Sequence, residues 1–155
     1  MTDAFMARAI DLAVENVKSG QGGPFAAVIV KDGRIVGEGA NAVTQMNDPT
    51  AHGEIMAIRA ACKNLGAFDL AGCEIHTSCE PCPMCLCAIY WARLDRIYCA
   101  CTAADAAAAG FEDAAFYDQL RKTADARQIP MTILLREQGR AAFRAWQEKT
   151  DKIPY

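Results

Sequence analysis

Two short motifs, separated by about thirty residues, constrain the fold of this chain more than any other feature of its sequence. Cys82 and Cys85 form a Cys-x-x-Cys pair, and His52 lies upstream with Glu54 two residues after it. Two thiolates and one imidazole are three ligands, the number that a catalytic zinc takes from protein while water holds the fourth position. Glu54 is left over, and a carboxylate beside such a water can accept and return its proton. The sequence therefore predicts a fold that brings these four side chains together.

Composition restricts the class of protein. A chain of 155 residues suits one domain with its own core, so we predict a single domain over residues 1–155. The net charge of −3 is unlike the basic balance of most nucleic-acid binders. Neither a signal peptide nor an apolar run of about 18 residues is recognisable. We therefore expect a cytoplasmic protein with no nucleic-acid or membrane partner, whose eight cysteines are metal ligands and small core residues.

The order of helical and extended patterns indicates an α/β fold. Helical spacing predicts an amphipathic helix over residues 3–19, with Phe5, Ala9, Leu12, Ala13 and Val17 facing inward. Asp32-Gly33 between two apolar runs predicts an antiparallel hairpin of strands 25–30 and 34–39. Residues 41–47 read as a polar loop and 102–110 as either loop or helix. The remaining predicted strands are 73–78, 96–101 and 131–135, and the remaining predicted helices are 49–65, 82–93, 111–120 and 138–149. The result is a five-stranded mixed sheet, mostly parallel after its opening hairpin.

Both metal motifs fall at predicted helix starts. Asp48 and Pro49 have the residue types of an N-cap and a first helical position, which places His52 and Glu54 in the first turns. Cys82 and Cys85 lie on one face of the first turn of their helix, where the helix dipole favours thiolate. Two helix N-termini beyond the ends of strands are a usual place for a site in an α/β sheet.

Other interpretations of the cysteine pair stay open on the residues alone. A redox pair also opens a helix after a strand. A structural zinc site would need a second pair, and Cys99 and Cys101 have the wrong spacing. Cys79 extends the motif towards an iron–sulfur pattern, but the fourth cysteine is out of place. A non-catalytic zinc or redox module is thus the alternative to an enzyme. His76, the second histidine, lies in a predicted strand, where it would be either packed or partly exposed.

Segments 47–54 and 78–85 resemble the cytidine deaminase-like superfamily, whose zinc enzymes for nucleobases carry His-x-Glu and Pro-Cys-x-x-Cys. Within it, the chain is most similar to bacterial guanine deaminases, because segments 22–25, 88–93 and 109–113 and the terminal Pro-Tyr also match. The similarity runs nearly end to end and implies a three-layer α/β/α sandwich with one zinc ion per subunit. Two departures are Gly53, where guanine deaminases more often carry Ala, and Glu112, where Asp is more usual.

The resemblance also implies roles for individual residues. His52, Cys82 and Cys85 match the zinc ligands, and Glu54 matches the proton shuttle. The positions matching substrate contacts are Phe25 and Trp91 in the wall of the base pocket, Asn41 on the purine, Glu112 and Asp113 at the guanine edge, and Tyr155. Asp113 is also a candidate for assisting the second proton transfer, as is Glu112.

The implied activity is hydrolytic deamination of guanine to xanthine and ammonia. The implied assembly is a homodimer that exchanges the C-terminal segment, about 138–155, so that Tyr155 reaches the partner's site. Cytosine, the aminotriazine ammeline and the wobble adenosine of tRNA are alternative substrates. The last would require a basic groove for phosphates, which the net charge disfavours.

Overall fold

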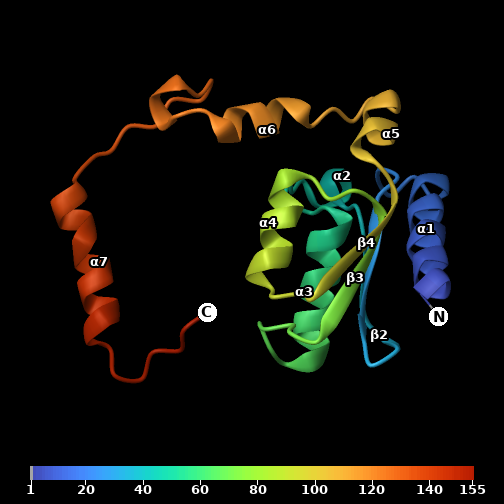
Figure 1. Cartoon of the computed structure of the whole chain (residues 1–155), viewed down its shortest axis with the longest axis horizontal. Helices are drawn as coiled ribbons and strands as arrows, with labels where there is room; N and C mark the ends of the chain where they lie inside the picture. The colour runs from blue at the N-terminus through green and yellow to red at the C-terminus, as the bar shows by residue number, and fades with distance from the viewer. Residues whose placement is uncertain (1) are drawn as a thin grey trace. The chain divides into compact units, whose positions relative to one another are not determined.

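The computed structural model describes residues 2–155, which form two compact units divided between Asp113 and Ala114. The N-terminal unit contains a four-stranded sheet in the order β2-β1-β3-β4 (Figure 1). The strands are β1 Ala26–Lys31, β2 Arg34–Ala40, β3 Cys73–Cys79 and β4 Arg96–Cys101. β1 pairs antiparallel with both β2 and β3, and the parallel pairing is between β3 and β4. The sheet is therefore mixed, as predicted, but its parallel part is smaller than expected.

The predicted hairpin is confirmed. Asp32 and Gly33 both have positive φ, 49° and 72°, as a two-residue type I′ turn requires. The register runs from Lys31 opposite Arg34 to Ala26 opposite Ala40, with one irregularity between Ile29 and Val30. The hairpin thus carries the chain back so that the start of β1 and the end of β2 lie side by side.

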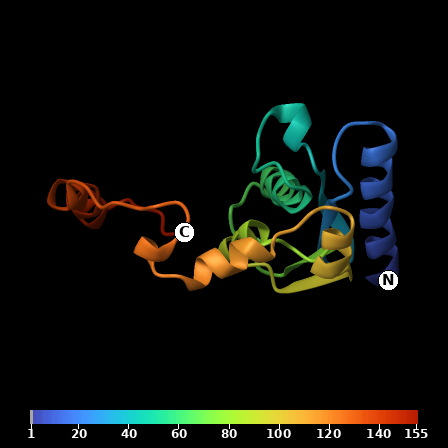
Figure 2. The same cartoon turned by 90° about the horizontal axis from the view of Figure 1, so that it is seen from above.

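Helices cover both faces of this sheet, which confirms the three-layer sandwich (Figure 2). α1, Thr2–Lys18, packs on one face, and α3, Gly53–Leu65, and α4, Pro83–Trp91, pack on the other. The core between the sheet and α3 and α4 consists of Ala27, Ile29, Ala57, Ala61, Leu70, Cys73, Ile75, Ile89 and Ala92. A smaller cluster of Ala9, Val28 and Val30 joins α1 to β1. His76 is fully buried on the α1 side, between the rings of Phe5 and Tyr98, so the packed alternative holds.

Two glycines of β2 set the distance between α3 and the sheet. A Cβ atom on Gly39 would lie 2.3 Å from the Ala57 nitrogen and 2.5 Å from the Gly53 oxygen. A Cβ atom on Gly37 would lie 2.6 Å from the Ala61 nitrogen. Because backbone atoms occupy this space, only glycine lets α3 approach so closely. The first turn of α3 is thereby held beside the end of β2.

The start of α3 differs from the prediction. The helix begins at Gly53 rather than at residue 49, and His52 is its N-cap. The Asp48 carboxylate accepts hydrogen bonds from the Thr50 nitrogen at 2.8 Å and hydroxyl at 2.7 Å, which stabilises a local turn rather than a helix start. The expected loop 41–47 also contains a single helical turn, α2, Val43–Met46.

The segment after β4 is helical rather than a loop: α5, Ala103–Ala108, begins with a capping box between Thr102 and Asp105. The C-terminal unit contains α6, Ala114–Arg121, a 3₁₀ turn, Ala124–Ala126, and α7, Arg136–Glu148. The predicted fifth strand at 131–135 is wrong, because these residues form no strand and are exposed. An apolar sequence favours a strand only where another strand edge is available for pairing. Within residues 2–155, no helix combines the length and apolar character that crossing a membrane requires.

Candidate functional site

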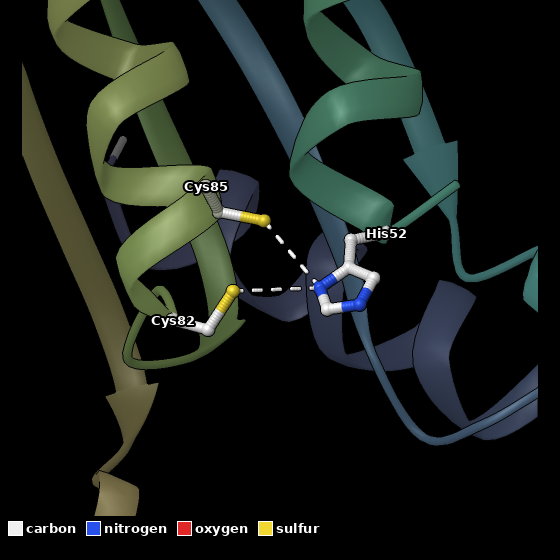
Figure 3. Close-up of side chains that lie close together, drawn as sticks. All are labelled: His52, Cys82 and Cys85. Carbon is white, nitrogen blue, oxygen red and sulfur yellow. Dashed lines mark hydrogen bonds between the residues drawn. The ribbon is translucent and has the colours of Figure 1, made fainter. Parts of the chain in front are cut away.

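Three ligand atoms converge where α3 and α4 begin. His52 Nδ1 lies 3.6 Å from Cys82 Sγ and 3.5 Å from Cys85 Sγ (Figure 3). Tetrahedral zinc, with bonds of about 2.3 Å to sulfur and about 2.0 Å to nitrogen, would separate S and N by about 3.6 Å. Within residues 2–155, these residues form a group of three whose ligand atoms all lie within 4.8 Å of one another. The donor set and its spacing therefore fit zinc.

Helix starts place these ligands. His52 is the N-cap of α3, with φ −71° and ψ 156°, and Cys82 is the N-cap of α4, with φ −64° and ψ 167°. Pro83 occupies the first turn of α4, where its missing N–H removes no hydrogen bond. Cys85 follows one turn after Cys82, so both sulfurs lie at the positive end of the α4 dipole. The predicted convergence of two helix N-termini is confirmed, although α3 starts later than expected.

Of the three ligands, Cys82 has the protonation that metal binding requires, whereas Cys85 would release its proton when a metal ion binds. A hydrogen bond from the Cys85 thiol lowers the pKa of Cys82 to about 4; burial opposes this effect and His52 supports it. The same hydrogen bond, together with burial, raises the pKa of Cys85. Hydrogen bonding to Cys82 raises the pKa of His52. Cys82 is therefore a thiolate at neutral pH, the form in which cysteine binds a metal ion.

Glu54 lies in the first turn of α3 and is 8% exposed. Burial is the main reason that its carboxyl pKa is raised, and the negative charge of Cys82 acts in the same direction. A carboxyl group with a raised pKa exchanges protons more readily near neutral pH than an ordinary glutamate. It is not one of the three ligand residues. The structure thus leaves it available for proton transfer.

Phe25, Asn41 and Asp113 lie on segments of the N-terminal unit that adjoin this centre. The Asn41 nitrogen donates to the Phe25 oxygen at 2.8 Å, which joins the start of β1 to the end of β2. The Phe25 ring meets Phe111 edge to face, with centroids 4.8 Å apart. Burial raises the pKa of Asp113, and the charge of Cys82 contributes next. Phe111 was not singled out from the sequence; its place directly before an acidic pair is the available signal.

Two of the predicted substrate residues are not brought to this centre within the N-terminal unit. Trp91 is the last residue of α4 and is 66% exposed, about 13 Å along the helix from the cysteine end. Tyr155 belongs to the C-terminal unit and is 73% exposed. Glu112, beside Asp113, is exposed. The contacts of these residues with a base therefore stay predictions.

The remaining cysteine of the predicted iron–sulfur alternative lies outside the ligand group. Cys79 is buried at the end of β3, and its thiol donates to the Thr102 oxygen at 3.4 Å. Burial is the main reason that its pKa is raised to about 11. Its sulfur does not belong to the group of three residues whose ligand atoms all lie within 4.8 Å of one another. Cys79 is therefore a core residue, and the metal group has three members rather than four.

Comparison with known proteins identifies the family. Residues 1–101 match the cytidine and deoxycytidylate deaminase zinc-binding region. This chain belongs to that deaminase family. Guanine deaminase of Bacillus subtilis (strain 168), a relative, is 51% identical over 153 residues, covering 99% of this chain and 98% of the relative. Its X-ray structure matches this one with a TM-score of 0.96.

More distant members of the deaminase family also match. Guanine deaminase from Nitrosomonas europaea is 32% identical, with a TM-score of 0.68 over 92% of this chain and 82% of that one. The tRNA-specific adenosine deaminase of Aquifex aeolicus is 42% identical, but over 48% of this chain and 49% of its own length. The expected resemblance to bacterial guanine deaminases within this zinc-dependent family is thereby confirmed.

Proposed function

We propose that this chain catalyses the zinc-dependent hydrolytic deamination of guanine to xanthine and ammonia. The observation that carries the proposal is a His-Cys-Cys centre beside buried Glu54, in a chain similar over its whole length to a guanine deaminase. Structural neighbours have been solved in complex with 8-azaguanine and with 2,6-diaminopurine, which supports a purine substrate. A non-catalytic zinc or redox module would not need the buried carboxyl group.

Protein groups perform the proton transfers. Bound zinc supplies hydroxide at neutral pH, because it lowers the pKa of water to about 7. Glu54 takes the proton of the attacking water and gives it to the ring nitrogen beside the amino-bearing carbon. It then takes the proton of the newly added hydroxyl group and delivers it to the departing amino group, so that ammonia leaves and the carbonyl of xanthine forms. Backbone N–H groups at the starts of α3 and α4 help to hold the developing negative charge.

The substrate contacts follow the arrangement of the N-terminal unit. The Phe25 ring would pack against the flat face of the base, and the Asn41 amide would hydrogen-bond its edge. Asp113 would accept hydrogen bonds from the guanine edge and assist ammonia release, with Glu112 beside it. We also propose, from the family resemblance, that Trp91 contributes to the wall of the pocket, although it lies at the opposite end of α4 from the ligands.

We also propose a homodimer in which the C-terminal segment is exchanged and Tyr155 completes the partner's site. Support comes from apolar side chains that the C-terminal unit exposes in one chain: Phe116, Ile133, Leu134, Leu135 and Phe143. Tyr90 and Trp91, at the end of α4, are also exposed. Apolar groups in such numbers usually pack against another surface. A reducing compartment such as the cytoplasm suits this protein, because its ligand cysteines must be thiolates.

The experiment is ammonia release from guanine, cytosine, adenine, ammeline, their nucleosides where these exist, and an anticodon-loop RNA with wobble adenosine. We expect guanine to be turned over fastest, turnover to stop on chelation, and zinc to restore it. If ammonia were released faster from another base, that base would be the substrate in place of guanine. No release from any base, with zinc fully bound, would refute the enzymatic proposal.

A further inference from the structure

A buried asparagine of α1 joins the two loops that carry the proposed base contacts. Asn16 is 7% exposed and lies on the face of α1 that also buries Ala9 and Ala13. The sequence pattern favours an apolar side chain at this point, and we expected Val17 to face inward. The structure instead leaves Val17 49% exposed and turns Asn16 to the interior. A polar group buried in an apolar stripe requires hydrogen-bond partners.

Those partners are two backbone carbonyls from separate segments. Asn16 Nδ2 donates to the Gly23 oxygen at 2.9 Å and to the Asn41 oxygen at 2.9 Å. A side-chain amide has two N–H donors on this nitrogen, so one group uses both to bridge the segments. Gly23 lies two residues before Phe25, and the Asn41 nitrogen in turn donates to the Phe25 oxygen at 2.8 Å. The three hydrogen bonds thus link Asn16, the segment from Gly23 to Phe25, and Asn41 into one closed loop that contains both proposed base contacts.

The joint, by which we mean the hydrogen-bonded contact of Asn16 with Gly23 and Asn41, is also closely packed. A Cβ atom on Gly22 would lie 2.2 Å from the Asn41 oxygen and 2.8 Å from Asn16 Nδ2. A Cβ atom on Gly23 would lie 3.6 Å from the Phe25 ring and 3.8 Å from the Asn41 side-chain oxygen. The hydrogen bonds of Asn16 to backbone carbonyls therefore fix the positions of Phe25 and Asn41 relative to each other, without involving the side chains of those two residues.

We propose that Asn16 is a positioning residue that sets the spacing of Phe25 and Asn41 and so determines how tightly the base is held. This inference rests on the proposed function, which assigns the base contacts to those two residues. α1 lies on the face of the sheet opposite α3 and α4 (Figure 1), and the side-chain hydrogen bonds of Asn16 go to the Gly23 and Asn41 carbonyls rather than to the metal ligands or Glu54. Its removal should weaken binding of the base without removing the chemistry.

The test compares Asn16→Asp and Asn16→Ala with Asn64→Ala. Asn16→Asp keeps the side-chain volume but replaces the bridging NH₂ group. Asn64 is the matched control, because its Nδ2 donates to the Val36 oxygen of β2 at 2.9 Å from the other end of α3. We expect both Asn16 variants to keep full zinc content and to raise KM about tenfold, because Phe25 and Asn41 lose their fixed spacing, with kcat nearly unchanged. Asn64→Ala should change stability alone.

Two further measurements separate positioning from general destabilisation. Gly22→Ala opens the same joint from the other side and should raise KM in the same way. The effect of Asn16→Asp on KM should be smaller in an Asn41→Ala background, because that variant keeps the backbone carbonyl that Asn16 binds but lacks the side chain that Asn16 positions. Additive effects, or an unchanged KM in folded, zinc-loaded Asn16 variants, would overturn the proposal.

Hydrogen exchange tests the joint without any substrate. Amides of segments 20–26 and 40–43 should exchange faster in the Asn16 variants than in Asn64→Ala. If the wild-type chain releases no ammonia from guanine while these segments loosen as expected, the proposed function fails and the joint stands. If guanine is turned over normally and the segments are unaffected, the positioning role fails alone.

Discussion

Replacing Gly39 with alanine tests how α3 and its ligand are held against the sheet. The new methyl group would lie 2.3 Å from the Ala57 nitrogen, 2.5 Å from the Gly53 oxygen and 2.6 Å from the Met56 Cβ atom. The nearest contact is thus more than 1 Å shorter than an ordinary one, which is about 3.5–4.0 Å. The obstructing atoms include backbone of the first turns of α3, so no side-chain rotation relieves the overlap.

The expected destabilisation is at the upper end of the range for overpacked cores, about 3 kcal/mol. The corresponding fall in Tm is about 10 °C for a unit of this size. Because the Gly53 peptide follows His52 directly, moving α3 outward also displaces the imidazole from Cys82 and Cys85. Changes beside ligands commonly weaken metal binding by about 10–100-fold, and we expect a loss in that range.

Urea unfolding and zinc competition with a chromogenic chelator measure the two effects. Gly139→Ala in α7 is the control, since no heavy atom outside its chain neighbours and its own helix backbone lies within 4 Å of the position that its Cβ would take. That substitution should leave the free energy of unfolding unchanged or raise it by up to about 1 kcal/mol. If Gly39→Ala unfolds at the same urea concentration as the wild type and binds zinc equally well, the close approach of α3 to β2 does not hold the site.

Other changes test the chemistry, the ligands, the assembly and one ion pair. Glu54→Gln should keep zinc but lower kcat by about 10²–10⁴-fold, and an active variant would exclude the shuttle role. Cys82→Ala should lose zinc, measured by metal analysis, whereas Cys79→Ala should keep it. Co-expression of Glu54→Gln with a chain lacking Tyr155 should restore part of the activity that each lacks alone; no recovery would exclude exchange of the C-terminal segment. Arg8 donates to both Glu38 oxygens, at 2.9 and 2.8 Å, and lowers the pKa of that carboxyl below 4.5. A carboxyl group whose pKa is lowered by folding stabilises the fold at pH values above its unfolded pKa, and this stabilisation is lost as the pH falls. The wild type should therefore be more stable than Arg8→Met by up to about 1 kcal/mol, the value for a half-exposed pair, and this difference should vanish between about pH 5 and about pH 3.

The ligand set and the hairpin could be predicted because each depends on short-range chemistry. Cys82 and Cys85 share a helical face whatever surrounds them, and Asp32-Gly33 favours one turn type in any context. The sequence also indicated that His52 belongs to a helix start. It could not give the exact start, because the Asp48 carboxylate bonds Thr50 instead of capping the helix. Two local structures compete for the same polar side chain there, and packing of α3 on β2 decides between them.

Features that depend on distant partners escaped prediction. Val17 has the better residue type for a buried position, but the carbonyls of Gly23 and Asn41 favour Asn16. The sequence of α1 alone does not indicate where those carbonyl groups lie. The strand expected at 131–135 failed for a related reason, since pairing requires an edge that the local sequence does not supply. Contacts of Trp91 and Tyr155 with a base also depend on surfaces beyond their own segments, and they stay predictions.

The use of N-cap residues as ligands has a consequence for how this protein loads metal. His52 and Cys82 adopt extended backbone angles immediately before their helices, so each ligand is positioned by the main chain as much as by its own rotamer. Fraying of either first turn would carry a ligand away, and capture of the ion would in turn suppress that fraying. Zinc binding and the formation of the first turns of α3 and α4 should therefore occur together, as a single cooperative event.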